Sequence, residues 1–210
     1  HENRLKEYNL LLTKTLSIIL ILSLPIIVGI SFVGTPFICE IYGESYIRSA
    51  EVLKILSFAI CISPIGYLLG SRVMLVTNQE NKMIFAVGTG AVVNVIGNGL
   101  MIPILAENGA ALASVLSEVI VAIVYIMISH RYFSLDYTKL LKTISKVVLS
   151  LAVMSIILFV FCSFIRNFIM YIFLVLLSII VYFGVLLLSK EETVYSYLKK
   201  IVGRLIKNGE

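Results

Sequence analysis

Residues Met83 to Ser129 read MIFAVGTGAVVNVIGNGLMIPILAENGAALASVLSEVIVAIVYIMIS, and this stretch decides the fold class. It contains two apolar runs, 83–105 and 109–129, separated by the short step 106–108. Each run is close to the roughly 20 residues that a helix needs to cross a hydrocarbon core. Because a backbone in lipid must satisfy its own hydrogen bonds, both runs are predicted to be transmembrane helices.

The same pattern occurs along the rest of the chain, and the segments between the apolar runs hold most of the charges. We therefore predict an all-α membrane protein with six transmembrane helices in one bundle over residues 1–192. A C-terminal amphipathic interfacial helix follows in the basic tail, residues 193–210. The four further predicted spans are 15–38, 53–76, 145–165 and 168–189.

Composition agrees with this class. Of the 210 residues, 60% are hydrophobic and 14% are charged, whereas soluble domains have about 45–50% apolar and about 25% charged residues. A cytosolic enzyme and a nucleic-acid-binding protein are therefore excluded. The scattered cysteines Cys39, Cys61 and Cys162 are interpreted as small apolar residues, because they form neither a metal motif nor a disulfide framework. The chain begins with His1 rather than Met, and we expect it to be a fragment that lacks its N-terminal part.

Basic residues alternate between the two sides of the predicted spans. Loops with many Lys and Arg residues alternate with loops that have few. Since cytoplasmic loops are enriched in Lys and Arg, the side with more of these residues, which includes both termini, is predicted to be cytoplasmic. The poorer side holds Arg48, Lys54 and Arg166. The richer side holds Arg4, Lys6, Lys14, Lys82, Arg131, Lys139, Lys142, Lys146, Lys190, Lys199, Lys200, Arg204 and Lys207.

The tail from Val194 to Lys207 has apolar residues at helical spacing on one face and Lys or Arg on the other. Such basic amphipathic helices lie among anionic headgroups at the membrane surface. We expect a surface anchor that contacts membrane lipid, with docking of a partner enzyme as the alternative.

Glu118 lies about halfway along the run 109–129, on one stripe with Ala111, Ser114, Ala122, Tyr125 and Ser129. A charge at the centre of a span costs about 2.5–3.5 kcal/mol, so it must face protein or a water-filled cavity. Glu118 is therefore a candidate for coupling to a cation or for lining a substrate path. The alternative is a structural carboxyl that holds neighbouring helices together.

Two asparagines and two cations complete the candidate path. Asn94 and Asn98 are one helical turn apart, and their amides either line a cavity or join helices. Lys54 and Arg72 are separated by five helical turns, which predicts the same face, although Pro64 between them is expected to kink the helix. Because both lie near span ends, extension of their side chains to the headgroups is the alternative.

The sequence lacks the common motifs of nucleotide-binding and zinc enzymes. It contains no phosphate-binding loop of the GxxxxGK type and no HExxH, and Asp136 is the sole aspartate. No nucleophile has a plausible base nearby. We therefore predict that the protein is not an enzyme and holds no metal and no cofactor.

Three stretches carry a resemblance to a known family. They are LPIIVGISFVGTPFICEIYGESYIRSAEVLKIL (24–56), VTNQENKMIFAVGTGAVVNVIGNGLMIPIL (76–105) and NGAALASVLSEV (108–119). In this order they resemble the C-terminal half of the Wzx-type polysaccharide-unit flippases. These belong to the multidrug/oligosaccharidyl-lipid/polysaccharide exporter superfamily. The phrase NGAALASVLSE is the most specific of the matches.

The resemblance implies a multi-pass protein of the bacterial inner membrane, which moves undecaprenyl-pyrophosphate-linked sugar units to the outer leaflet for O-antigen or capsule. In that family two six-helix bundles enclose a central cationic cavity, and coupling to a proton or sodium ion has been proposed. Here it implies that Arg72, Asn94 and Asn98 face the cavity and that Glu118 couples or gates. Because this chain supplies one bundle, it would need the missing N-terminal half or a second copy.

Three other functions stay open. A multidrug antiporter and a peptidoglycan-precursor flippase belong to the same superfamily as the flippases. A non-transporting scaffold, whose tail recruits polysaccharide assembly enzymes, belongs to a different class.

Overall fold

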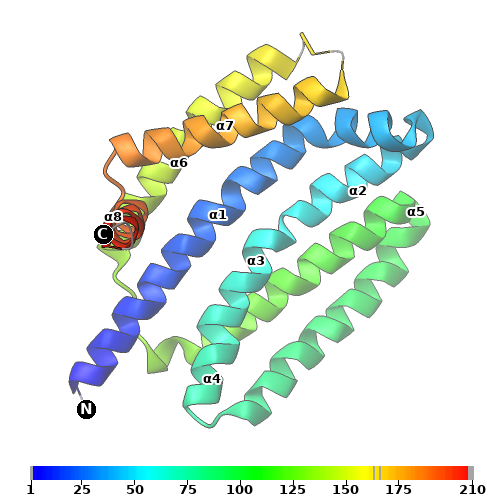
Figure 1. Cartoon of the computed structure of the whole chain (residues 1–210). Helices are drawn as coiled ribbons and strands as arrows, with labels where there is room; N and C mark the ends of the chain where they lie inside the picture. Colours follow the sequence, from blue (N-terminus) through cyan, green and yellow to red (C-terminus); the bar gives the residue numbers. More distant parts are fainter. Residues whose placement is uncertain (1, 163, 166, 208–210) are drawn as a thin grey trace.

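The computed structural model of the chain is all-helical (Figure 1). It describes the backbone of residues 2–162, 164–165 and 167–207, and the side chains of residues 4–162, 164–165 and 167–199. His1, Arg166 and residues 208–210 of the predicted tail lie outside these ranges. Five segments are long and apolar enough to cross a membrane, as an all-α membrane protein requires. They are Arg4–Tyr42, Glu44–Val76, Glu80–Tyr132, Tyr137–Cys162 and Phe168–Leu188.

The first segment is one continuous helix. α1 (Glu2–Tyr42) has 41 residues and contains Pro25 and Pro36. At about 1.5 Å per residue it is about 60 Å long, twice the thickness of a hydrocarbon core. It therefore extends beyond the predicted span 15–38 at both ends. In Figure 1, α1 crosses the middle of the molecule, and it packs against α6 and α7 on one side and α2 and α3 on the other.

The second segment is divided into short pieces. It comprises the 3-10 turn η1 (Glu44–Tyr46), α2 (Ile47–Ser57), α3 (Ala59–Gly66), the π-helix η2 (Tyr67–Arg72) and α4 (Val73–Val76). Pro64 lacks an amide hydrogen and crowds the preceding turn, which is the physical reason to expect a distortion here. The structure places that distortion on both sides of Pro64, as an interruption at Phe58 and as the π-helix.

Residues 83–129 belong to a helical hairpin. α5 (Glu80–Ser129) changes direction at Ala106, whose φ of 49° and ψ of −127° are not helical. Its two arms, 80–105 and 107–129, run antiparallel in close contact, since a Cβ on Gly97 would lie 3.0 Å from that of Ala113. The turn falls within the step 106–108 that separates the two predicted spans. The 3-10 turn η3 (His130–Tyr132) follows.

The last helices lie on the other side of α1. α6 (Tyr137–Cys162) begins earlier than the predicted span 145–165, because a carboxylate oxygen of Asp136 accepts a hydrogen bond from the Lys139 amide (3.0 Å). That contact is an N-terminal cap. α7 (Phe168–Leu188) and α8 (Glu192–Lys207) follow. The main apolar core joins α1, α6 and α7 through Ile21, Val33, Val147, Met154, Leu158, Leu174, Tyr182 and Leu186.

Candidate functional site

The polar stripe of the second α5 arm packs mainly against the distorted second segment. Ala122 and Tyr125 are buried, and so is Ser129, whose hydroxyl donates to the Leu69 carbonyl in η2. A Cβ on Gly70 would lie only 2.1 Å from that of Tyr125. Small residues allow helix backbones to approach this closely, and in lipid such close approach drives association. Most of the predicted stripe is therefore a helix contact.

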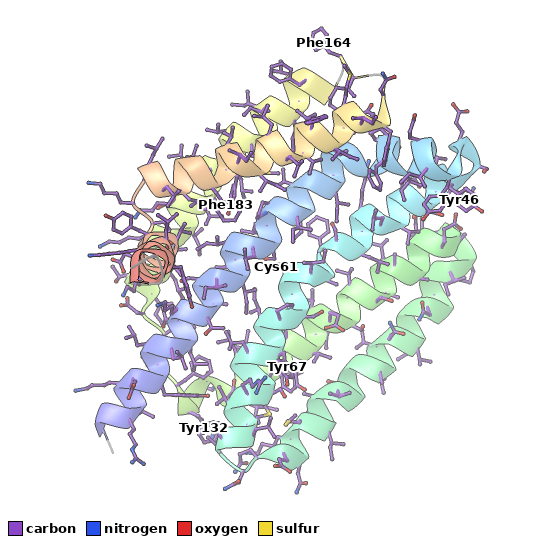
Figure 2. The ribbon with its side chains drawn as sticks, viewed as in Figure 1. Tyr46, Cys61, Tyr67, Tyr132, Phe164 and Phe183 are labelled. Carbon is purple, nitrogen blue, oxygen red and sulfur yellow. The ribbon has the colours of Figure 1, made fainter. Side chains whose placement is uncertain are left out.

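Arg72 ends the π-helix and is exposed. Its guanidinium carbon lies 5.2 Å from the centre of the Tyr67 ring, which is a cation–π distance. Figure 2 shows Tyr67 on the segment between α3 and α4. The ion pairs among the described side chains are Arg48 with Glu107 and Lys139 with Glu192, so Arg72 carries a charge that neither neutralises. Local π-helical turns are frequent at functional sites.

Glu118 is half-buried on the second arm of α5. It takes part in neither of these ion pairs and in none of the side-chain hydrogen bonds of the described residues. Ser114, one turn away on the same stripe, donates its hydroxyl hydrogen to the Ala110 carbonyl of its own helix at 3.0 Å. Glu118 is therefore a carboxyl at mid-helix whose hydrogen-bonding capacity is unused within the described chain.

The two asparagines join the arms of the α5 hairpin. The Asn98 amide nitrogen donates to the Asn94 side-chain oxygen at 2.9 Å, and the Asn94 amide nitrogen lies 3.5 Å from the Ser117 hydroxyl on the other arm. This is the helix-joining role that was the alternative to a place on the cavity wall. The side-chain oxygen of Asn98 is nevertheless buried without a partner among the described residues. The Asn98 side-chain oxygen is therefore a hydrogen-bond acceptor that no described residue uses.

Lys54 is half-buried on α2 and lies apart from the groups above. The α-helical spacing that predicted a common face with Arg72 does not apply here, because the segment between them is interrupted at Phe58 and includes a π-helical turn. No hydrogen bond or ion pair within the described side chains connects any two of Lys54, Arg72 and Glu118.

Three cavities in the described part of the chain lie elsewhere. A cavity of about 580 Å³ is lined by apolar residues of α1, α2, α6 and α7. One of about 380 Å³ lies between α1, α7 and α8, and one of about 260 Å³ lies between α1, α6 and α8. None of the five predicted path residues lines them. Those residues belong to helix surfaces and helix contacts.

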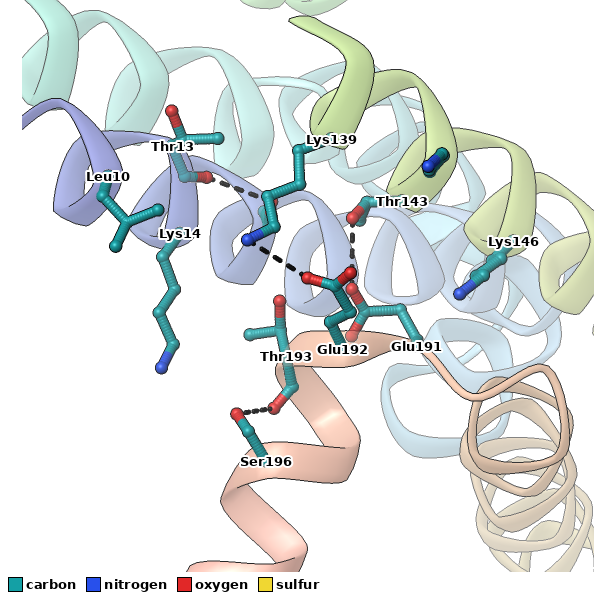
Figure 3. Close-up of a pocket in the computed structure, with 12 residues that line it drawn as sticks. Leu10, Thr13, Lys14, Lys139, Thr143, Lys146, Glu191, Glu192, Thr193 and Ser196 are labelled. Atoms are coloured by element: carbon teal, nitrogen blue, oxygen red, sulfur yellow. Dashed lines mark hydrogen bonds and ion pairs between the residues drawn. The ribbon is translucent and has the colours of Figure 1, made fainter. Parts of the chain in front are cut away.

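The smallest of these cavities is lined mainly by charged and hydroxyl side chains (Figure 3). The sequence did not predict that these residues come together. Glu191 is 1% exposed, and its carboxylate accepts hydrogen bonds from the Thr143 hydroxyl (3.1 Å) and the Val194 amide (2.7 Å). Lys139 pairs with Glu192 at 3.1 Å. The sequence signal was the pair of acidic residues at the start of an otherwise basic amphipathic helix.

Comparison with known proteins identifies no relative. No protein-family model matches the chain, and neither a curated protein nor a solved structure matches it.

Proposed function

We propose that this chain is one bundle of a transporter that moves undecaprenyl-pyrophosphate-linked oligosaccharides across the bacterial inner membrane. The observation that carries the proposal is Glu118, a carboxyl at the middle of a lipid-length helix arm that has no ion-pair or hydrogen-bond partner among the described side chains. Ionisable groups at such depth are costly and mark transport paths more often than packing sites. The resemblance of residues 24–56, 76–105 and 108–119 to Wzx-type flippases supplies the substrate class.

The topology belongs to the same proposal. The two arms of α5 each cross the membrane, which makes six spans, and both termini lie in the cytoplasm because most Lys and Arg residues fall on that side. α8 then lies along the cytoplasmic interface. In this proposal the exposed faces of the described α2–α5 segments meet a second six-helix half or a second copy, since one bundle supplies a single wall of an alternating-access cavity.

Within that cavity Arg72 attracts the pyrophosphate and Glu118 binds the coupling cation, a proton or sodium ion. The cation–π contact with Tyr67 holds the Arg72 guanidinium on the exposed side of η2. Asn94, Asn98 and Lys54 are secondary candidates. The spare acceptor of Asn98 could serve a sugar hydroxyl only if the hairpin arms separate.

Surface polysaccharide in cells tests these roles. Arg72→Ala removes charge-assisted hydrogen bonds of about 1.5–3 kcal/mol, so export should fall about tenfold or more. Glu118→Gln should abolish coupled export while it preserves size and helix propensity. The matched controls are Arg131→Ala and Glu80→Gln. They change exposed residues of the same types that lie outside the predicted spans.

Normal polysaccharide in both Arg72→Ala and Glu118→Gln cells, at normal amounts of protein in the membrane, would contradict the proposal. Resistance to organic cations would instead favour a multidrug antiporter, and loss of viability on depletion would favour a peptidoglycan-precursor flippase. Loss of function on deletion of 193–210, with active Arg72 and Glu118 variants, would favour a scaffold.

A further inference from the structure

The polar cavity between α1, α6 and α8 is surrounded by positive charge. Four lysines line it together with two glutamates, so its side chains carry a net positive charge. The lysines come from segments far apart in the sequence, one from α1 and three from one face of α6. They are Lys14, Lys139, Lys142 and Lys146.

Two of these lysines and both glutamates are already engaged. Lys139 pairs with Glu192, and the Lys146 ammonium donates to the Lys190 carbonyl at 2.8 Å. Buried Glu191 is satisfied by a hydroxyl and an amide, and it fixes the start of α8 against α6. Among the described side chains, neither glutamate therefore forms an ion pair with Lys14 or Lys142.

Lys14 and Lys142 are the cations left for a ligand. Lys142 is exposed and joins no ion pair of the described side chains. The Lys14 ammonium lies 5.0 Å from the centre of the Tyr197 ring on α8, and Lys14 lines the cavity. Two cations from different helices that line one cavity are suited to an anionic phosphate group.

An apolar cavity adjoins the basic one, and Thr193 lines both. Its volume is about 380 Å³, and Leu22 and Phe183 continue its wall into the cavity of about 580 Å³ between α1, α2, α6 and α7. The basic cavity of about 260 Å³ is smaller than the roughly 300–1,000 Å³ of typical ligand sites. It is therefore suited to a headgroup, and the apolar cavities are suited to the attached chains.

We propose that the cavity between α1, α6 and α8 binds the phosphate headgroup of an anionic membrane phospholipid, with its acyl chains in the adjoining apolar grooves. Basic pockets between transmembrane helices on the cytoplasmic side bind such headgroups. The bound lipid would secure the start of α8 against α1 and α6. This site is distinct from Arg72 and Glu118 and does not depend on the transport proposal.

Spin-labelled lipids in bilayers that contain the 210-residue chain test the site. Labelled phosphatidylglycerol should be retained at the protein over labelled phosphatidylcholine. Lys14→Gln with Lys142→Gln should lower that preference about fivefold or more, as expected for two lysines near a surface. Lys6→Gln with Lys82→Gln is the matched control, because it removes the same charge from the same predicted side but outside the cavity. Helix content and monodispersity show that both double variants fold.

Equal losses of preference in the two double variants would overturn the proposal in favour of diffuse surface attraction. A second measurement uses the unchanged protein and needs no variant. Glycerol phosphate or inorganic phosphate should fail to displace labelled phosphatidylglycerol at millimolar concentration, because neither fills the apolar grooves. Displacement by either would overturn the proposal and assign the cavity to a free phosphate ion.

Discussion

The two sides of α1 are held together in different ways. On the α6–α7 side, large apolar side chains such as Leu158 and Leu186 are fully buried, and Tyr182 donates to the Ile21 carbonyl at 2.9 Å. On the α2–α5 side, glycines allow close approach, as between Gly66 and the backbone of Ala122 and between Gly70 and the Tyr125 side chain. The difference teaches that, in the described part of the chain, close glycine packing and distorted helix occur together on the second side.

That contrast fits a division of labour. The α1–α6–α7 side resembles a rigid core, and it also carries α8 with its lysine cluster. The α2–α5 side contains the π-helix, the reversal at Ala106, and Arg72 and Glu118, which join no ion pair of the described side chains. We expect function to depend on the second side and anchoring on the first.

The largest effect on stability is expected from Gly70→Val. The new Cβ would lie 2.1 Å from that of Tyr125, so η2 must move away from α5. Overpacking of this kind costs about 3 kcal/mol. Unfolding by sodium dodecyl sulfate in mixed micelles, followed by circular dichroism, measures it. Gly88→Val is the control, since a Cβ there meets nothing within 4 Å. Equal losses in the two variants would remove the contrast between the sides of α1.

Leu158→Ala tests the apolar side and should cost less. The unfolded span remains in an apolar medium, so the transfer part of a Leu→Ala cost is largely absent and the cavity part remains, about 1–2 kcal/mol. The same unfolding experiment applies, with Leu188→Ala as control because Leu188 is 84% exposed. A cost above that of Gly70→Val would reverse the comparison.

The smallest effect, and a stabilising one, is expected from Ala106→Gly. Ala106 has a positive φ of 49°, a region that favours glycine, so the substitution relieves backbone strain. Greater freedom of the unfolded chain offsets part of the gain, which leaves about 0.5–1 kcal/mol. Thermal unfolding in detergent should show a higher midpoint, and a lower midpoint would refute the strain. Ala91→Gly, in the middle of a helical arm, should instead destabilise.

Much of the fold could be predicted because hydrophobicity and turn position are local properties. The apolar runs located the helices, and the step 106–108 located the reversal of α5. The second segment could not be read in the same way. A distortion near Pro64 was foreseeable, but its division between Phe58 and a π-helix was not, and the segment there packs closely on α5 at Gly66 and Gly70.

The sequence indicated which polar residues lie in the apolar segments, but not which residues they contact in the fold. Asn94 and Asn98 were correctly placed on one face, but their partner Ser117 lies across a hairpin whose packing no local pattern specifies. The lysine cluster was missed for the same reason, since Lys14 and Lys142 belong to helices that meet only in the folded chain.

Sequence alone determined that this is a helical membrane protein, which stretches are apolar and which polar groups enter them. The tertiary structure decided which of those groups are consumed by helix contacts and which, such as Arg72 and Glu118, are left without a partner among the described residues. The physical reason is that an apolar helix face is equally stable against lipid and against another helix. The rotation of each helix about its axis is therefore set by close packing and hydrogen bonds with its neighbours rather than by hydrophobicity.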